Sequence, residues 1–350
     1  MADRRGPLPQ ALAPLAWCAA RVYGLGVSLR NARFDRGVGV RRLEVSGVCV
    51  PVISVGNLTA GGTGKSPFVA WVCAELVRAG AQPVIAMRGY GAEAPEESDE
   101  AREYATTAPG ARVVVDPDRV SALHAALSQV DAADLARCVV VLDDGFQHRR
   151  LARDLDLVLV DATRPGLGGR LLPAGWLREP AGALRRADLV VVTRAAGFDG
   201  KLAAAIQRFH GREPFAWCDH RWSSIEVVSP AGSRVEPVAW LAGRPVALVA
   251  GIGNPAAFVG AARRAGVSIE RETIARDHAF WEGTAGDAAL ASGRGPGLVL
   301  TTRKDWVKLA ARPLPPGIEV AIPRLELAFL GGEEPLRERL ASAARANLRR

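Results

Sequence analysis

The sequence has little of several features that define common classes of protein. Only four of its 45 basic residues are lysine, so arginine carries nearly all of the positive charge. Its five cysteines include no CxxC pair and no histidine at a zinc-ligand spacing. This excludes the common structural zinc sites and predicts the reduced, buried thiols of a cytosolic protein. No apolar run approaches the roughly 20 residues that a membrane-spanning helix requires.

The basic charge narrows the classes of partner. The net charge is +8, yet no aromatic-and-basic stacking pattern and no zinc-finger or homeodomain spacing accompanies it. We therefore expect no nucleic-acid partner. The charge is compatible with an anionic membrane face or a phosphorylated substrate. A chain of 350 residues with 49% hydrophobic residues suits two domains, or one large α/β domain with additions.

One stretch, VISVGNLTAGGTGKS at residues 52–66, has the pattern of a phosphate-binding loop. An apolar β-branched run breaks into glycines, and an amphipathic helical pattern follows. Strand, glycine-rich turn and helix form the context in which backbone N–H groups and a helix N-terminus bind phosphate. Lys65 would reach the β- and γ-phosphates, and Ser66 would offer a hydroxyl to Mg²⁺. The predicted nucleotide-binding residues are Thr59, Gly61, Gly62, Thr63, Gly64, Lys65 and Ser66.

The loop departs from the usual GxxxxGK[ST] pattern at one position. Thr59 stands where the first glycine is expected, and Gly61 and Gly62 partly compensate for it. The alternative is a glycine-rich turn between strand and helix that binds no ligand. The complete Gly64-Lys65-Ser66 ending favours the nucleotide, so ATP is the predicted cofactor.

A pair of aspartates provides candidate metal ligands. The apolar run CVVVL at 138–142 leads directly into Asp143 and Asp144, as in a Walker-B strand. Mg²⁺ prefers oxygen ligands and retains several waters, so one or two carboxylates with Ser66 suffice. A lone aspartate after a strand is more often a helix cap, but a consecutive pair downstream of a P-loop favours the metal. His148 either orients a carboxylate, contacts phosphate or is an ordinary turn residue.

The order of apolar runs predicts an α/β fold with a parallel sheet. Continuous apolar strands alternate with helical stretches, which is typical of sheets covered on both faces. The pattern begins again after residue 215. We therefore predict a P-loop NTPase-like domain over 41–215 and a second, smaller α/β domain over 216–350. Residues 91–101, low in apolar side chains, are expected to form a surface loop.

The first forty residues are predicted to form a separate amphipathic segment. A helix is expected from Pro14 toward Leu29, with apolar residues on one face and arginines around it. Such a helix is typical of proteins that lie on a membrane surface. A helix that docks on the protein's own surface is the alternative. The predicted apolar face consists of Leu15, Cys18, Ala19, Val22 and Leu25.

Seven motifs together resemble the tetraacyldisaccharide 4′-kinase (lipid A 4′-kinase) family, in the same order along nearly the whole chain. DDGFQH and LLPAGxLREP follow the P-loop in this order, and together they are far more specific to the family than the P-loop alone. The motifs are GNLTAGGTGKSP (56–67), RGY (88–90), DDGFQH (143–148), GRLLPAGWLREP (169–180), AGIGNPAAF (250–258), DHAF (277–280) and TTRKDWVKL (301–309).

The resemblance implies an activity and a location. A family member phosphorylates the 4′-hydroxyl of a tetraacylated glucosamine disaccharide 1-phosphate with ATP, a late step of lipid A synthesis. It works peripherally at the cytoplasmic face of the inner membrane, with ATP and Mg²⁺ as cofactors. The lipid precursor and the inner-membrane surface are then its partners, and no obligate protein partner is expected. Two α/β domains and a bilayer-contacting N-terminal helix are implied as well.

The resemblance also assigns residues. It implies that Asp99 is the catalytic carboxylate and that His278 is its partner, which together could act as a general base for a sugar hydroxyl. Around Asp99 the chain reads ESDEAREYA, without the family's usual glycine before the aspartate. Asp143, Asp144 and His148 match the family's metal-associated motif. Candidate contacts to phosphate or to ATP are Arg88, Arg119, Arg170 and Arg178.

A P-loop switch NTPase that acts on a protein partner is the competing hypothesis. Guanine recognition would require an [NT]KxD-like run after a later strand. The nearest stretch, Thr302 to Asp305, has lysine and aspartate adjacent and does not fit. Phosphorylated product that forms only with a lipid acceptor would favour the kinase.

Overall fold

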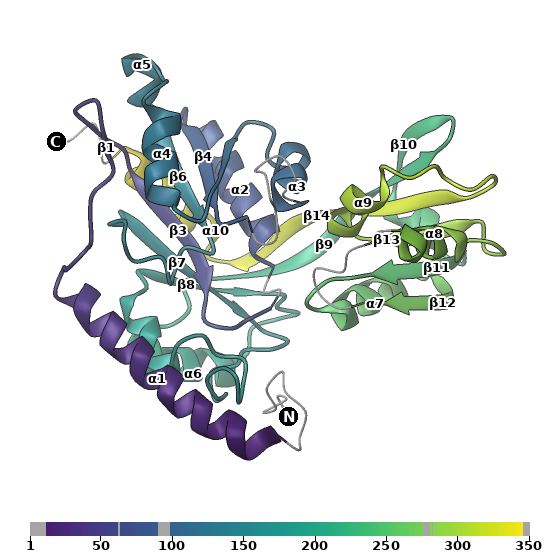
Figure 1. Cartoon of the computed structure of the whole chain (residues 1–350). Coiled ribbons are helices and arrows are strands. Elements are labelled where there is room, and N and C mark those ends of the chain that lie inside the picture. Colours follow the sequence, from purple (N-terminus) through teal and green to yellow (C-terminus); the bar gives the residue numbers. More distant parts are fainter. Residues whose placement is uncertain (1–11, 62–63, 90–98, 276–280, 282, 346–350) are drawn as a thin grey trace. The chain divides into compact units, whose positions relative to one another are not determined.

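The computed structural model describes residues 12–61, 64–89, 99–275, 281 and 283–345. The chain divides into two compact units. The first comprises Met1–Asp219 together with Ala328–Arg350, and the second comprises His220–Leu327. The chain passes from one unit to the other within two long strands, β9 (Ala216–Ser229) and β14 (Glu319–Gly331) (Figure 1). Each unit is an α/β layer, as the apolar pattern predicts.

The first unit is built on a parallel sheet in the order β8-β7-β3-β6-β4-β5. Strands β3, β6, β7 and β8 are buried along their whole length, which explains their continuous apolar sequences. The start of β9 pairs in parallel with β8. The strands are β3 (Val52–Asn57), β4 (Gln82–Met87), β5 (Arg112–Val115), β6 (Cys138–Asp143), β7 (Leu155–Asp161) and β8 (Leu189–Thr193). A short antiparallel pair, β1 (Glu44–Val45) and β2 (Val48–Cys49), precedes them.

Helices cover this sheet through two main apolar clusters. Leu123 and Leu127 of α4 pack with residues of β4 and β6, whereas Leu184 of η3 and Ile206 of α6 pack with residues of β7 and β8. Helix α3 begins at Asp99, so the last three residues of the predicted surface loop, 99–101, are helical. The helical elements are α2 (Lys65–Arg78), α3 (Asp99–Thr107), α4 (Arg119–Leu127), α5 (Ala132–Leu135), η3 (Ala181–Arg186) and α6 (Gly200–His210).

The last helix, α10 (Glu333–Ala344), belongs to the first unit. The sequence pattern predicts that all of residues 216–350 belong to the second domain. The physical reason for the difference is that α10 buries Leu336 and Leu340 and lies against α2. Arg337 also places its Nε 3.2 Å from Oε2 of the buried Glu75 in α2. The end of the chain therefore supports the helix that follows the glycine-rich loop.

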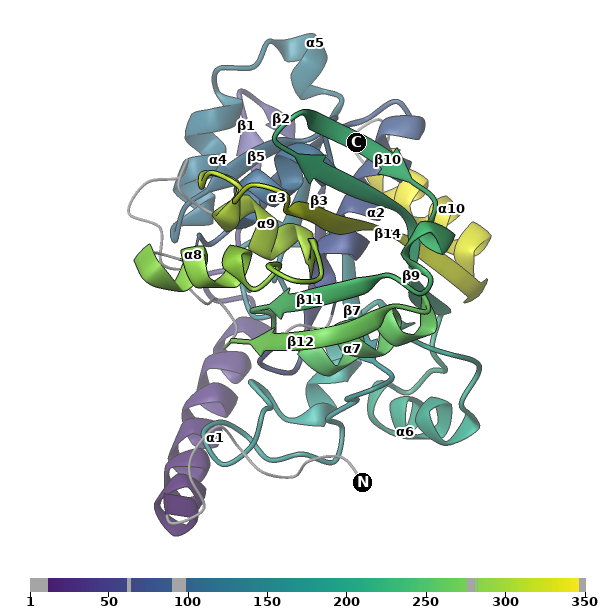
Figure 2. The same ribbon diagram turned by 90° about the vertical axis from the view of Figure 1, so that its right-hand side faces the viewer.

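The second unit contains the strand order β12-β11-β13-β14-β9, with β10 antiparallel to β9. Alternate residues of β11 enter two apolar clusters, one with α7 and one with α8 and α9. Figure 2 shows α7 on one side of β11 and the other two helices on the opposite side. The remaining elements are β10 (Gly232–Glu236), η4 (Val238–Leu241), β11 (Pro245–Ala250), α7 (Pro255–Arg264), β12 (Ser268–Ile274), α8 (Gly283–Ala291), β13 (Leu298–Thr301) and α9 (Arg303–Leu309).

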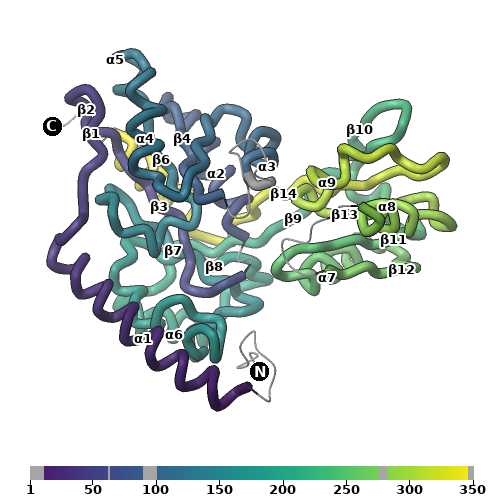
Figure 3. The backbone as a smooth tube through the Cα atoms, in the orientation of Figure 1, coloured from purple at the N-terminus to yellow at the C-terminus, as the bar shows by residue number. Residues whose placement is uncertain are grey.

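The N-terminal helix α1 (Ala13–Asp35) lies along the outside of the first unit (Figure 3). It is longer than the predicted helix, and small residues make most of its docking face. Ala16 and Ala20 are buried against Leu171 and Ala174. The predicted apolar face points to solvent, and so α1 both docks on the protein and exposes an apolar surface. The exposed stripe consists of Leu15, Cys18, Ala19, Val22, Leu25 and Leu29.

No helix in the described part of the chain combines the length and the apolar character that crossing a membrane requires. The cysteines are all free. Cys73, Cys138 and Cys218 are buried as predicted, but Cys18 is exposed because it lies on the outer side of α1.

Candidate active site

The carboxyl ends of β3 and β6 bring the two predicted motifs together. These strands are parallel neighbours, with Val55 opposite Asp143 in the register. The loop after β3 and the aspartate pair after β6 therefore emerge at the same edge of the sheet, where ligands of open α/β sheets bind. In this loop Gly61 and Gly64 have φ of 111° and 78°, which favour glycine. Gly62 and Thr63 lie outside the described residues.

Lys65 opens helix α2 and points back toward the start of its own loop. Its Nζ donates a hydrogen bond of 3.1 Å to Oδ1 of Asn57, the last residue of β3. The same Nζ lies 3.4 Å from Oδ1 of Asp144. Ser66 follows, partly buried. An ammonium group at a helix N-terminus is suited to bind an anion such as a triphosphate.

Asp144 is an ionised carboxylate held by two cations. Its other oxygen accepts a hydrogen bond from Nη1 of Arg178, a residue of the LREP motif. Burial alone would raise the pKa of Asp144, but the charges of Lys65 and Arg178 outweigh burial, and the pKa falls to about 2. The φ of Asp144 is +52°, a conformation that costs an ordinary L-residue about 1 kcal/mol. The surrounding structure must therefore hold this residue in place.

Asp143 is buried and bonded on both its side chain and its main chain. The hydroxyl of Tyr104, in α3, donates a 2.8 Å hydrogen bond to its Oδ2. Nη1 of Arg119, at the start of α4, donates a 2.9 Å bond to its carbonyl oxygen. Arg119 thus supports the main chain of the aspartate pair, and its contact with a phosphate stays a prediction.

The segment after the aspartate pair fits tightly against β3. A Cβ on Gly145 would lie 2.6 Å from Oγ of Ser54, and a Cβ on Gly56 would lie 2.6 Å from the backbone nitrogen of Phe146. Both positions are therefore closed to larger residues. Gln147 donates a 3.0 Å hydrogen bond from Nε2 to the carbonyl of Asn57. The DDGFQH segment is in this way bonded to the strand that leads into the glycine-rich loop.

The guanidinium of Arg153 bonds to the main chain of the DDGFQH segment. Its Nη2 lies 2.7 Å from the carbonyl oxygen of Gly145, 3.3 Å from that of Phe146 and 2.8 Å from that of His148. Its Nη1 lies 3.6 Å from Oδ2 of Asp156 in β7. Both side chains are nearly inaccessible to solvent, with 11% and 6% of their surfaces exposed. Burial raises the pKa of Asp156 to about 6, against the opposing charge of Arg153.

His148 is neutral at physiological pH. Burial is the main cause, and the charges of Arg119 and Arg153 add to it, so the pKa of His148 falls to about 4. An uncharged imidazole can accept a hydrogen bond or orient a carboxylate, and it adds no positive charge to the site. Its contact with phosphate or substrate stays a prediction.

The LPAGWLREP segment lies along the first half of the glycine-rich loop. The backbone N–H of Arg178 donates a 2.8 Å hydrogen bond to the carbonyl of Leu58, and that of Ala60 donates a 2.7 Å bond to the carbonyl of Trp176. Thr59 forms a β-bridge with Leu177. The position of the missing first glycine is thus fixed by pairing with another segment, which explains why threonine is tolerated there.

Glu179, next to Arg178, is fully buried and held by three donors. Asn31 donates from Nδ2 over 2.7 Å, Arg30 from Nη2 over 3.2 Å and Arg186 from Nη1 over 2.8 Å. A buried carboxylate needs such partners. Arg170 of the same segment and Arg88 at the end of β4 are exposed, and their contacts with substrate stay predictions.

Two predicted catalytic residues are not placed by the structure. His278 lies outside the described residues, and only the backbone of Asp99 is described, as the first residue of α3. Their pairing therefore stays a prediction. The sequence analysis assigned no role to four polar residues of the site, namely Asn57, Tyr104, Arg153 and Glu179. Asn57 ends an apolar strand and Glu179 lies in the LREP motif, so both carried a usable signal, whereas no local signal identifies Tyr104 and Arg153.

The residues present fit Mg²⁺ rather than a preformed cage for a metal. In the described part of the chain, no group of three or more His, Cys, Asp and Glu residues gathers as a metal site. Mg²⁺ commonly uses one or two carboxylates with phosphate oxygens and waters, so it requires no such cage. Asp144 stays ionised, and Asp143 and Ser66 add oxygen donors from the neighbouring strand end and helix start.

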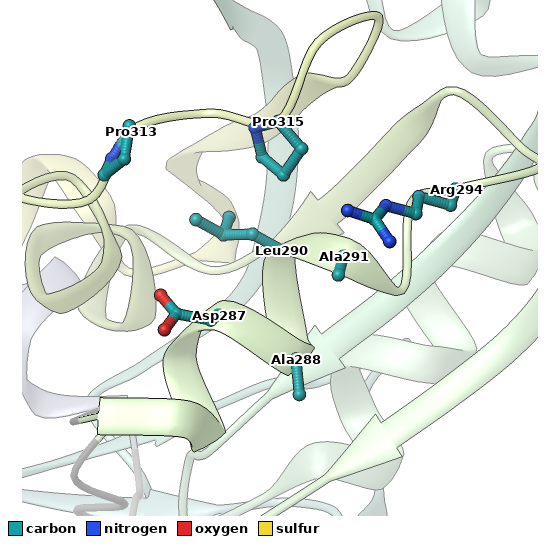
Figure 4. Close-up of a pocket in the computed structure, with 7 residues that line it drawn as sticks. All are labelled: Asp287, Ala288, Leu290, Ala291, Arg294, Pro313 and Pro315. Carbon is teal, nitrogen blue, oxygen red and sulfur yellow. The ribbon is translucent and has the colours of Figure 1, made fainter.

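A separate hollow of about 350 Å³ lies in the second unit between α8 and a proline-containing segment (Figure 4). Apolar side chains and two charged ones line it. The carboxylate of Asp287 is bonded by Arg312 over 2.6 Å. None of the predicted site residues belongs to this hollow, whose lining residues are Asp287, Ala288, Leu290, Ala291, Arg294, Pro313 and Pro315.

Comparisons with known proteins agree with the geometry. A family model described as tetraacyldisaccharide-1-P 4′-kinase (LpxK) matches residues 10–345. A tetraacyldisaccharide 4′-kinase of Geobacter sulfurreducens is 40% identical over 83% of this chain and 83% of its own length. One of Chlorobaculum parvum is 33% identical over 93% of both chains. A crystal structure of LpxK from Aquifex aeolicus in complex with ATP superposes with a TM-score of 0.69 at 27% identity, over 95% of this chain and 98% of that one.

Proposed function

The chain belongs to the tetraacyldisaccharide-1-P 4′-kinase family, and from that premise we propose that it transfers the γ-phosphate of ATP to the 4′-hydroxyl of a tetraacylated glucosamine disaccharide 1-phosphate. It is a kinase of lipid A biosynthesis with ATP as the phosphate donor. The observation that carries the proposal is the placement of Lys65 at the start of α2, within 3.4 Å of the ionised Asp144.

Phosphoryl transfer depends mainly on positioning and on neutralising charge. Backbone N–H groups of the glycine-rich loop and the Lys65 ammonium bind the β- and γ-phosphates. Ser66, Asp143 and Asp144 are the residues that would hold Mg²⁺. When bound, this ion neutralises charge on the transferred group. Arg178 keeps the Asp144 carboxylate oriented toward the loop.

The acceptor hydroxyl requires a base. Asp99 and His278 take this role in the proposal, on the ground of the family resemblance. Asp99 orients and stabilises the charged imidazole, and His278 takes the proton from the 4′-hydroxyl. His148, neutral with a pKa of about 4, orients a neighbouring group and does not act as a cation. Arg88 and Arg170 are exposed and are proposed to meet the phosphate of the substrate.

The outer stripe of α1 supports a peripheral location at the cytoplasmic face of the inner membrane. Leu15, Val22, Leu25 and Leu29 have between 63% and 73% of their surfaces exposed. One turn after another, they present apolar groups that a monomer in water would otherwise leave solvated. An interfacial helix buries such a stripe among lipid head groups, and the acyl chains of the substrate reside in the same layer.

The test is transfer of label from γ-³²P-ATP to a detergent-dispersed disaccharide lipid acceptor. The expected result is that the label is transferred to the 4′ position of the disaccharide lipid, and that little phosphate is released when the acceptor is left out. Acceptor-independent release of phosphate with no labelled lipid would instead indicate a switch NTPase. The two outcomes exclude each other, so one assay decides between the hypotheses.

A further inference from the structure

The polar side of α1 contacts the segment that carries Arg178. The hydroxyl of Tyr23 donates a 2.9 Å hydrogen bond to the carbonyl oxygen of Arg178. Asn31 and Arg30 donate to the carboxylate of Glu179 over 2.7 Å and 3.2 Å. Positions seven and eight residues apart lie on one face of a helix. Three side chains of that face are therefore bonded to two consecutive residues of the site.

The contacts with α1 matter because the carboxylate of Glu179 is completely buried. None of its surface is exposed, and among the described residues its remaining hydrogen-bond donor is Arg186, over 2.8 Å. A buried carboxylate that loses a donor keeps an unsatisfied oxygen, because no solvent replaces the bond, and it is expected to move toward its remaining donors. The orientation of the segment at 178–179 therefore depends on donors that α1 supplies.

The segment passes this dependence on to the nucleotide site. The guanidinium of Arg178 bonds Asp144, and its backbone N–H donates to the carbonyl of Leu58 at the start of the glycine-rich loop. Asp144 in turn lies 3.4 Å from the Lys65 ammonium. A displacement of the segment by a fraction of an ångström would thus change the position of the Asp144 carboxylate, which is expected to lie beside the bound triphosphate.

We propose that Tyr23 and Asn31 of α1 are positioning residues for the nucleotide site, acting through Glu179 and Arg178 on Asp144. The two sides of α1 then have different roles. The outer side carries the apolar stripe, and the inner side maintains the orientation of the Asp144 carboxylate, which would bind Mg²⁺. This inference rests on the proposed function, since it concerns the same ATP site. Because linkage is reciprocal, occupation of the nucleotide site should in turn make α1 more rigid.

The experiment compares three variants of the full chain by calorimetry with ATP and Mg²⁺, without lipid. Asn31→Leu removes the amide donor at nearly constant volume, and Tyr23→Phe removes only a hydroxyl. Ser28→Ala is the matched control, because in the described part of the chain its hydroxyl bonds to the carbonyl of Gly24 in the same helix and to no residue of the site. Substitutions behind a metal ligand commonly weaken metal binding or activity by 10- to 100-fold. One step further out, we expect the Kd for ATP with Mg²⁺ to rise about threefold to tenfold in Asn31→Leu and about twofold in Tyr23→Phe.

Two further readouts separate positioning from mere packing. The Mg²⁺ concentration that gives half-maximal kinase rate should rise with the Kd, while the KM for the lipid acceptor stays within about twofold of wild type. Hydrogen exchange of α1 amides should slow when ATP and Mg²⁺ are added to the wild type, and not in Asn31→Leu. Ser28→Ala should behave as the wild type throughout.

Several results would overturn the inference. A lower melting temperature with unchanged Kd and unchanged Mg²⁺ dependence means that the inner side of α1 only packs. A change confined to the KM for lipid means that α1 acts only on the acceptor. If Asn31→Leu does not fold, an unaltered Kd for ATP with Mg²⁺ in Tyr23→Phe is enough to reject the inference. Failure of the wild type to phosphorylate lipid would instead reject the proposed function, and calorimetry would still decide this inference.

Discussion

Replacement of Arg153 by methionine tests whether this buried cation holds the DDGFQH segment. The substitution keeps an unbranched apolar stem but removes a guanidinium that lies within 2.7–3.3 Å of three carbonyl oxygens. It also removes the ion-pair partner that lies 3.6 Å from the buried carboxylate of Asp156, which then keeps only the charge of Arg186 and the hydroxyl of Ser54 among its described favourable neighbours. Breaking a buried ion pair on one side costs about 3–5 kcal/mol. We take about 3 kcal/mol at pH 8 as the expected loss of unfolding free energy.

The loss should depend on pH, and the sign follows from Asp156. Its folded-state pKa is already raised to about 6, from an ordinary value near 4. Without Arg153 the folded-state pKa rises further, so the variant binds a proton more readily than the wild type does. Lowering the pH therefore relieves the variant more. The difference in unfolding free energy should shrink from pH 8 to pH 5.5, toward the roughly 1–2 kcal/mol that lost hydrogen bonds alone represent.

Native-state hydrogen exchange of amides in β3 and β6 is the appropriate assay. It reports the stability of the first unit alone, whereas a whole-chain melt mixes two units. Arg150→Met is the control, because Arg150 is exposed and should change stability by less than about 0.5 kcal/mol. The double variant Arg153→Met with Asp156→Leu should recover much of the loss, since an apolar pair can replace a buried ion pair. A loss below about 1 kcal/mol, or one that does not vary with pH, would refute the reasoning.

Four other perturbations test the nucleotide site, the catalytic pair, the buried histidine and the outer stripe of α1. Lys65→Ala should lower phosphoryl transfer more than a hundredfold in the labelled-ATP assay; activity within about tenfold of wild type, some 1.4 kcal/mol of barrier, would contradict the nucleotide site. Asp99→Ala and His278→Ala should each reduce kcat more than ATP affinity, and the double variant should be little worse than the poorer single one; additive losses would mean that the two do not work as a pair. His148 has a pKa of about 4 in the fold and near 6.5 when unfolded, so its contribution to stability should fall by roughly 2 kcal/mol between pH 7 and pH 4.5, while the raised pKa of Asp156 acts in the opposite direction. His148→Gln should remove the His148 contribution, so the stability difference between variant and wild type should shift by roughly 2 kcal/mol in favour of the variant over this range; a constant difference would contradict it. Leu25→Ser should weaken co-sedimentation with anionic vesicles by roughly 1 kcal/mol, and equal binding would remove the outer stripe of α1 from the membrane contact.

The sequence predicted the sheet well because its signal is local and repetitive. Strands of a parallel sheet covered on both faces are mostly apolar, and each of the runs at 52–57, 138–143 and 189–193 is mostly apolar and buried over its full length. The glycine-rich loop and the aspartate pair were predictable for a related reason. Their chemistry is written in consecutive residues, and parallel strands bring their carboxyl ends to one edge.

What the sequence did not predict depends on contacts between distant segments. Tyr104 meets Asp143 across 39 positions, and Asn31 meets Glu179 across 148. Neither residue differs, in its own neighbourhood, from an ordinary helix residue. Arg153 in an RLARD run likewise reads as a solvated arginine until β7 and the DDGFQH segment enclose it. Burial of a charge is a property of the fold, and periodicity of the chain does not reveal it.

The return of α10 to α2 has a consequence for synthesis of the chain on the ribosome. The helix that carries Lys65 is covered by residues 333–344, which leave the exit tunnel only after the whole second unit has been made. Until then the part of α2 that contacts α10, including the carboxylate of Glu75, is uncovered by that helix. A chain that stops just before this helix should therefore bind nucleotide more weakly, although residues 333–344 are distant in the sequence from the glycine-rich loop.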